Sequence, residues 1–202
     1  MLVYSDLLVA IAAAPRVTIH GPWARCIEYA LLQGPPPGRP RRSRPQPLWP
    51  GGSVLSGARF TPVGSFSTLY LASDFATAQT ETGSVFSHAA LANTTIATEP
   101  VVTFAVDGVL TDVIDFHDPT AQALAGTTTS ELTGSWQLAT PAPTQELGRA
   151  AFDSGVITAL KYPSSKRVGG WGLAVFVDRL TLNTVNFIEV VDKTLKLKQR
   201  LP

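Results

Sequence analysis

A proline- and glycine-rich segment early in the chain restricts the fold more than any other feature. Residues 34–52 read GPPPGRPRRSRPQPLWPGG. Repeated proline removes the backbone N–H donors that a helix interior or a central strand needs, so we predict a loop or tether here. Residues 1–52 then comprise N-terminal helices and this loop, packed on or tethered to a core of residues 53–202. The length of 202 residues suits one domain overall.

Composition indicates a globular protein and points to no partner. Apolar residues make up 45% of the chain and charged residues 15%, which is enough apolar material for a core and argues against global disorder. The formal net charge is only +1, so any electrostatic attraction must come from a local patch. The dense basic run RPRRSR at 39–44 fits a solvated loop. Nucleic-acid contact or attraction of an anionic ligand is the alternative, although no aromatic residues are interleaved as single-strand binding would require.

Two short helices are predicted before the proline-rich segment. Residues 1–17 are apolar and alanine-rich, but they lack the positive start of a signal peptide and Asp6 interrupts the run, so we interpret them as a helix. Residues 21–33 carry apolar side chains at helical spacing. The shared stripe consists of Trp23, Ile27, Ala30 and Leu31. No segment reaches the roughly 18 to 20 apolar residues of a membrane span.

A single cysteine, Cys26, rules out an internal disulfide and a cysteine-based metal cluster. We expect it to be a small buried residue within the second helix. A reduced, cytoplasmic setting is consistent with this cysteine usage.

Strands and helices follow in irregular order. Two short strands around a TPVG turn are predicted within 53–72, and Ser73 or Asp74 can cap the helix that follows. Residues 100–116 predict two strands joined at Asp107-Gly108, because an Asp-Gly pair favours a two-residue hairpin turn.

The remaining elements determine the fold class. Asp118 caps a further helix with Pro119 in its first turn. Two helical pieces and three strands follow, at residues 130–140, 143–155, 156–162, 170–178 and 186–192, and the basic residues 193–202 form a strand end or tail. Because strands and helices do not alternate strictly, a doubly wound sheet is disfavoured. We predict an α+β fold with mixed, mostly antiparallel sheets and flanking helices.

Common catalytic and metal signatures are absent from the sequence. It contains no P-loop, no GxGxxG, no HExxH and no nucleophile elbow. The three histidines lack metal-ligand spacing, and an acidic cluster is explained more simply by helix caps and turn ends than by a cation site. These residues are His20, His88 and His117, and Asp112, Asp115 and Asp118. We therefore expect no metal.

Two segments carry the candidate site. The first, GARFTPVGSFSTLYLASDFATAQTET at 57–82, spaces Arg59, Tyr70 and Glu81 evenly, which offers a cation, an aromatic face and a carboxylate. Taken alone, they are equally consistent with a surface arginine, a core-edge tyrosine and a solvated glutamate.

The second segment, LKYPSSKRVGGWGLAVF at 160–176, places polar residues where a strand ends. Pro163 breaks the strand, and Ser164 and Ser165 follow it at the start of a glycine-rich loop. Strand ends and the loops after them are where a rigid sheet presents side chains to a cleft.

Together these segments resemble the RES domain family, over about residues 53–178. The family is named for its arginine, glutamate and serine, and its members are toxins of bacterial toxin–antitoxin pairs with Xre-type antitoxins. The first segment is similar to its Gly-led arginine, Leu-Tyr strand and TAxxE helix. The second is similar to its Pro-Ser, glycine turn and apolar strand. Trp136 lies where the family often has a tryptophan.

The resemblance places the family's arginine, tyrosine and glutamate at Arg59, Tyr70 and Glu81. The serine falls on Ser164, with Ser165 as the alternative.

The chain also departs from the family's pattern. Thr61 stands where the family often has asparagine, the insert at 34–52 is long, and only Arg25 is available as the arginine of an early strand.

The resemblance implies an ADP-ribosyltransferase-like fold with NAD+ as substrate. Arg59 would hold the pyrophosphate through its planar donors, and Tyr70 would stack on the nicotinamide. Glu81 would stabilise the positive charge that develops on the ribose, and Ser164 would donate a hydrogen bond to the substrate. Lys166 and Arg167 either hold a phosphate or belong to a solvated loop.

The predicted function is therefore that of a cytoplasmic toxin that degrades NAD+ by hydrolysis, or by phosphorolysis with inorganic phosphate as co-substrate. Its partner would be an Xre-type helix-turn-helix antitoxin, and DNA would be contacted only through that antitoxin, with no membrane involved. Alternatives are a mono-ADP-ribosyltransferase acting on a protein, and a non-catalytic module that binds NAD+ or nucleic acid.

Overall fold

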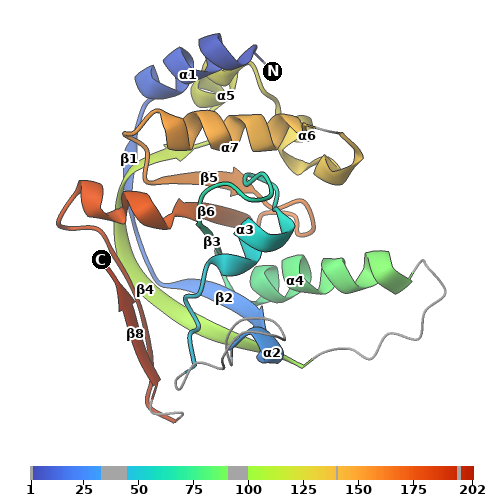
Figure 1. Cartoon of the computed structure of the whole chain (residues 1–202), viewed down its shortest axis with the longest axis vertical. Helices are drawn as coiled ribbons and strands as arrows, with labels where there is room; N and C mark the ends of the chain where they lie inside the picture. Colours follow the sequence, from blue (N-terminus) through green and yellow to red (C-terminus); the bar gives the residue numbers. More distant parts are fainter. Residues whose placement is uncertain (1, 33–44, 91–99, 140, 195–196) are drawn as a thin grey trace.

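One long strand, β4 (Val101–Asp115), connects the parts of the sheet. Its first half pairs antiparallel with β2 (Trp23–Glu28), and later residues pair antiparallel with β1 (Val17–His20) and β7 (Phe187–Asp192). Its last residues run parallel to β5 (Ala159–Pro163). The curve of β4 around one side of the molecule is visible in Figure 1. These pairings come from a computed structural model, which describes residues 2–32, 45–90, 100–139, 141–194 and 197–202.

The sheet closes on itself. Its strand order is β2-β3-β6-β5-β4-β7-β8, where β3 is Thr68–Ala72, β6 is Trp171–Phe176 and β8 is Leu197–Leu201. Because β2 pairs with both β3 and β4, the strands β2, β3, β6, β5 and β4 form a barrel-like ring. Apart from β4 with β5, the pairings are antiparallel. The predicted α+β class with a mostly antiparallel sheet is confirmed.

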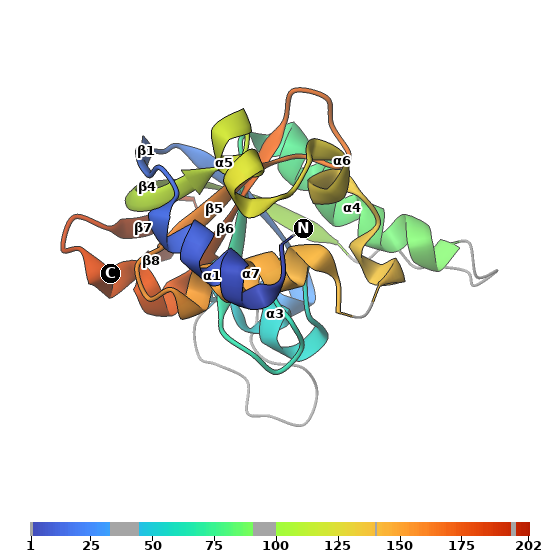
Figure 2. The same cartoon turned by 90° about the horizontal axis from the view of Figure 1, so that it is seen from above.

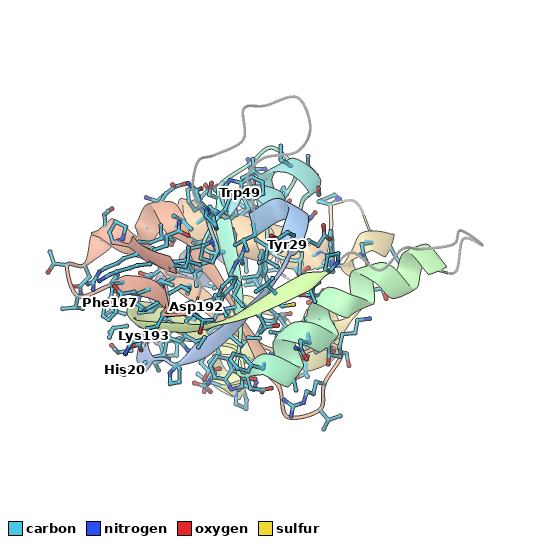
Figure 3. All side chains as sticks on the ribbon, turned by 90° about the horizontal axis from the view of Figure 1, so that it is seen from below. His20, Tyr29, Trp49, Phe187, Asp192 and Lys193 are labelled. Carbon is cyan, nitrogen blue, oxygen red and sulfur yellow. The ribbon has the colours of Figure 1, made fainter. Side chains whose placement is uncertain are left out.

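Helices flank this sheet. They are α1 (Tyr4–Ala13), α2 (Tyr29–Leu32), α3 (Gly51–Ser56), α4 (Phe75–Ala90), α5 (Pro119–Ala125), α6 (Thr129–Thr133) and α7 (Pro143–Asp153), with 3-10 turns η1 (Trp136–Leu138) and η2 (Val177–Leu182). Figures 1 and 2 show α1, α5 and α7 together on one side of β5 and β6. Helix α4 packs against β2 and β3 instead. Seen from below in Figure 3, α4 runs along one side of the strands, opposite His20 and Phe187.

Alternation along β5 and β6 separates two hydrophobic cores. Leu173 and Val175 face the inside of the ring, whereas Ala174 and Phe176 face the helices α1 and α7. Both faces of β6 are buried, which explains its nearly continuous apolar sequence. Strand β5 is therefore held between two packed layers, and this fixes the position of the loop that follows it.

The predicted helix at 21–33 is wrong over most of its length. Residues Trp23–Glu28 form β2, and only Tyr29–Leu32 are helical. Trp23 and Ile27 share one face in both structures, because a separation of four residues fits the helical period and the strand period equally. In the strand they face the core inside the ring. Cys26 accordingly lies in a strand and is partly exposed.

The predicted hairpin at Asp107-Gly108 is also wrong, since β4 runs straight through it. Gly108 serves a close approach of neighbouring groups rather than a turn. A Cβ at this position would lie 2.4 Å from the carbonyl oxygen of Phe187 and 2.9 Å from the ring of Trp23. The glycine therefore allows β4 to pass between two strands.

The interval between the proline-rich segment and β3 was predicted incorrectly in part. Residues 51–56 form helix α3 rather than a strand, and 57–61 contain only an isolated bridge between Ala58 and Thr61. Most of the proline-rich segment, including the basic run at 39–44, lies outside the described residues. Its described part is 45–52. Residues 45–50 have no helix or strand, as predicted, whereas Gly51 and Gly52 begin helix α3 instead of belonging to the loop.

Most other elements are confirmed. They are the first helix, the helix after Asp74, the helix capped by Asp118, the two helical pieces and the three strands, with β8 formed by the basic C-terminal residues. Gly155, with φ of 74°, follows α7 as predicted. In the described part of the chain, no helix has the length and apolar character needed to cross a membrane.

Gly148 should be required for the close packing of α7 against the segment at 57–61, which carries Arg59. In Gly148→Ala the new Cβ would lie 1.9 Å from the carbonyl oxygen of Phe60, so the helix must move. We expect a loss of about 3 kcal/mol in the free energy of unfolding, measured by denaturant titration. Gly52→Ala in helix α3 is the matched control, because nothing lies within 4 Å of its Cβ; it should be neutral or stabilising by up to about 1 kcal/mol. Equal effects of the two substitutions would contradict this packing.

Candidate active site

A cavity of about 530 Å³ lies where β2, β3, β5 and β6 meet helix α4 and the segments at 57–59 and 133–137. Its lining includes the predicted residues Arg59, Tyr70 and Glu81, together with Ser165 and Lys166. These residues come from four separate stretches of the sequence, and only the fold brings them together. The volume falls within the range of small-molecule sites.

Glu81 is held by the loop that follows β5. The hydroxyl of Ser164 donates a hydrogen bond to Glu81 Oε1, and the backbone N–H of Ser165 donates to the same oxygen over 3.1 Å. The structure therefore brings both candidate serines to the glutamate, one by its side chain and one by its backbone. Asp74 Oδ1 accepts from the backbone N–H of Thr77 at the start of α4, and this cap sets the rotation of the helix that carries Glu81.

Ser165 differs from Ser164 in where its side chain lies. Ser165 lines the cavity, and its Oγ is buried without a hydrogen-bond partner among the described residues. A buried hydroxyl without a partner is unfavourable by itself. Because the Oγ has almost no accessible surface, a ligand in the cavity could reach it only after the side chain rotates.

Arg59 is anchored on one side only. Its Nη1 donates to the carbonyl oxygens of Leu132, over 2.7 Å, and Gly134, over 2.8 Å. Within the described ranges, Nη2 and Nε make no hydrogen bond. The guanidinium thus has a fixed orientation while two nitrogens remain for an anion.

Tyr70 supports the segment that carries Arg59. Its hydroxyl accepts from the backbone N–H of Phe60 over 3.0 Å and shares a hydrogen bond of 2.9 Å with Thr61 Oγ1. Burial raises the pKa of Tyr70 to about 12, so the hydroxyl stays protonated at neutral pH. Thr61, where the resemblance leads one to expect asparagine, supplies a polar group to this contact.

Tyr162 is a cavity residue that the sequence reasoning missed. It packs on Phe60 with ring centroids 4.6 Å apart, and a Cβ on the neighbouring Gly172 would lie 2.6 Å from its hydroxyl oxygen. Burial, followed by the proximity of Tyr70 and Glu81, raises its pKa. Its place in strand β5 just before Pro163 was the available signal, since alternation turns it to the face opposite its two strand neighbours.

Trp136 and Arg25, the two other residues that the resemblance suggested, both line the cavity. The guanidinium of Arg25, however, donates to three carbonyl oxygens at 2.7–2.9 Å, those of Pro47, Trp49 and Tyr70. Burial lowers the pKa of Arg25 to about 10, which leaves it charged at neutral pH. Arg25 therefore holds the strand of Tyr70 to the loop before α3.

Lys166 and Arg167 are adjacent in the loop after β5, but their side chains make different contacts. Lys166 is exposed and lines the cavity, with no hydrogen bond or ion pair from its side chain among the described residues. Arg167 lies outside the cavity lining, and its Nη1 contacts both carboxylate oxygens of Asp74 at 2.6 and 2.7 Å. The two cations, interpreted from the sequence either as phosphate ligands or as residues of a solvated loop, thus have different surroundings.

Among the described residues, no group of three or more histidine, cysteine or acidic side chains could hold a metal. The acidic cluster has structural partners instead. Asp118 caps α5, Asp115 pairs with Lys161 and His117, and Asp112 pairs with Arg16.

Comparison with known proteins identifies the family. The model of the RES domain matches residues 36–193. This chain belongs to the RES domain family. The matched region contains Arg59, Tyr70, Glu81 and both serines, so the resemblance at 53–178 is confirmed.

A solved structure shares the RES-domain fold found here. It is a chain in the crystal structure of the M. tuberculosis MbcT–MbcA toxin–antitoxin complex, with a TM-score of 0.68 and 19% sequence identity over 93% of this chain and 90% of that chain. No curated protein matches the sequence significantly.

Removing the Tyr70 hydroxyl should destabilise the protein. In Tyr70→Phe the buried N–H of Phe60 loses its acceptor, which should lower the free energy of unfolding by about 1–3 kcal/mol at pH 7.

The pKa of Tyr70 near 12 also means that the folded state holds the phenolic proton more tightly than the unfolded state, whose tyrosine has a pKa of about 10. Stability from this group is present below pH 10 and lost as the pH rises toward 12. Denaturant titrations across this range should show a weaker pH dependence in the variant; identical slopes would contradict the assignment.

Proposed function

We propose that this protein is the toxin of a bacterial toxin–antitoxin pair, and that it consumes NAD+ by cleaving the bond between nicotinamide and ribose. The observation that carries the proposal is the meeting of Arg59, Tyr70, Glu81 and Ser165 at one cavity of a RES domain, with Ser164 hydrogen-bonded to Glu81. Membership of the family and the toxin–antitoxin complex among similar structures support it.

The cavity offers a group for each part of the substrate. The remaining nitrogens of Arg59 and the ammonium of Lys166 suit the two charges of the pyrophosphate. The aromatic side chains of Tyr70, Tyr162 and Trp136 suit the flat nicotinamide ring, since stacking on a base is favourable by roughly 1–3 kcal/mol.

Glu81 supplies the stabilising charge. When the glycosidic bond breaks, its electron pair leaves with nicotinamide, which becomes neutral, and positive charge develops on the ribose. A carboxylate held in place by Ser164 and Ser165 stabilises that charge more in the transition state than in the bound substrate. Because its hydrogen bonds are already formed, Glu81 needs no reorganisation during the step.

The acceptor determines the products. Attack by water gives ADP-ribose, nicotinamide and a proton, whereas attack by inorganic phosphate gives phosphorylated ADP-ribose and nicotinamide. A protein side chain as acceptor would instead give mono-ADP-ribosylation. The exposed Lys166 at the cavity is a candidate to hold a phosphate acceptor.

An activity that removes NAD+ requires control, so the proposal includes an antitoxin of the Xre helix-turn-helix type. DNA would be contacted through that partner. A stable complex in the cytoplasm would keep the toxin inactive until the antitoxin is lost.

Purified protein should consume NAD+, and Glu81→Gln should slow this by about 100- to 1000-fold, the size typical for loss of a preorganised stabilising group. Glutamine keeps an oxygen acceptor for Ser164 and Ser165 and removes only the charge. Glu189→Gln on β7 is the matched control, because Glu189 is near Lys198 and does not line the cavity; it should retain full activity. Chromatography of NAD+ and nicotinamide over time provides the measurement.

Parallel reactions with and without inorganic phosphate distinguish the acceptors. A rate that depends on phosphate, with phosphorylated ADP-ribose as product, identifies phosphorolysis; ADP-ribose in both reactions identifies hydrolysis. Label transfer from NAD+ to cellular protein without free ADP-ribose would favour protein modification. NAD+ left unchanged by folded protein in all three assays would refute the catalytic proposal.

A further inference from the structure

Helix α4 contacts the loop at 164–170 at two separate points. Glu81 receives the hydrogen bonds of Ser164 and Ser165, and two helical turns earlier Asp74 pairs with Arg167. Positions 74 and 81 share one face of a helix, since seven residues complete nearly two turns. The loop is therefore fastened to α4 at both the catalytic position and the start of the helix.

The contact at the start of the helix is a network rather than a single pair. Arg167 Nη1 donates to Asp74 Oδ1 and Oδ2 at 2.6 and 2.7 Å and to Thr77 Oγ1 at 2.9 Å. Asp74 is itself fixed by the N–H and hydroxyl of Thr77 and the hydroxyl of Ser73, at 2.7–2.9 Å. These hydrogen bonds, with that of Arg167, hold the pKa of Asp74 well below its usual range. The carboxylate thus stays charged at physiological pH.

Backbone hydrogen bonds link Arg167 to Ser164. The backbone N–H groups of Lys166 and Arg167 both donate to Ser164 Oγ, at 3.2 and 3.1 Å. The loop is closed by the N–H of Ser164 donating to the Gly170 carbonyl over 2.9 Å and the N–H of Gly170 donating to the Arg167 carbonyl over 3.1 Å. A movement of Arg167 therefore moves the serine that contacts Glu81.

The loop also lies against the helix with little room. A Cβ on Gly170 would lie 2.7 Å from Thr77 Oγ1, so only glycine allows this approach. Arg167 and Thr77 thus meet beside a close approach of the loop backbone to α4.

We propose that Asp74 and Arg167 form a clasp that positions Ser164 and Ser165 on Glu81, and that Arg167 is a positioning residue rather than a ligand for a phosphate. The catalytic part of this inference rests on the proposed function. The side chains of Asp74 and Arg167 are each 43% exposed, so the pair adds little to overall stability. Its effect is on geometry, and small displacements of catalytic groups lower rates strongly.

Three variants test the clasp: Asp74→Asn, Arg167→Gln and the double substitution. Asparagine retains an acceptor for the cap of α4 and removes only the charge. Arg149→Gln is the control, because Arg149 is also an exposed arginine paired with an aspartate, Asp153, away from the cavity. Hydrogen exchange of the Ser165 and Gly170 amides reports on the loop in the free protein without any need for activity.

We expect those two amides to exchange about two- to fivefold faster than in the parent protein in both single variants, the size expected for loss of an exposed ion pair. In the double variant the exchange should be no faster than in either single variant, because the pair can be lost only once. In NAD+ consumption, kcat should fall about 10- to 100-fold in both single variants with KM unchanged. Arg167→Lys, which keeps the charge, should restore part of kcat. The control should match the parent protein throughout.

Two results would overturn the clasp. One is wild-type amide exchange in both single variants. The other is a raised KM with unchanged kcat in Arg167→Gln alone, which would make Arg167 a substrate ligand. If the parent protein consumes no NAD+, the proposed function fails, while the exchange measurements still decide whether Asp74 and Arg167 hold the loop.

Discussion

The pairing of β4 with four other strands is the constraint on which the rest of the structure depends. It closes the ring by joining β2 at one end and β5 at the other, and it leaves β3 and β6 between them. Tyr70 and Tyr162 project from strands of that ring, and the loop with Ser164 begins where β5 ends. The two tyrosines are held by strands of the ring, and hydrogen bonds fasten the loop and helix α4 to each other at Glu81, so the residues of the site are attached to regular elements.

Three arginines near the cavity have different roles, and only Arg59 both lines the cavity and keeps nitrogens that face no protein acceptor among the described residues. Arg25 uses its donors on backbone carbonyls, Arg59 uses one nitrogen in this way, and Arg167 is occupied by Asp74. Their roles differ because their hydrogen-bond partners differ, although the residue type is the same. The net charge of the chain could not have distinguished the three arginines, because it counts each of them equally and says nothing of their partners.

The sequence predicted elements well where local signals were unambiguous, as at the Asp118 cap and the apolar run of β6. It failed at β2, where apolar spacing fitted helix and strand equally, and at Gly108, where a turn-forming pair serves close packing.

The site shows the same division. Arg59 and Glu81 could be found because their side chains have distinctive chemistry within a family pattern, and their catalytic roles remain predictions. Tyr162 could not be found in this way, because an aromatic residue in an apolar strand is ordinarily a core residue. The partner of Arg167 is 93 residues away in sequence, so no local pattern could indicate it.

The anchoring of Arg59 to the carbonyl oxygens of Leu132 and Gly134 has a consequence for mutagenesis. The same guanidinium that faces the cavity also fastens the chain just before Trp136. Truncating Arg59 would remove both hydrogen bonds to that segment as well as a charge, so an alanine variant would measure a change in the cavity wall together with the loss of the positive charge. Only a replacement that keeps both carbonyl contacts could separate recognition from architecture at this position.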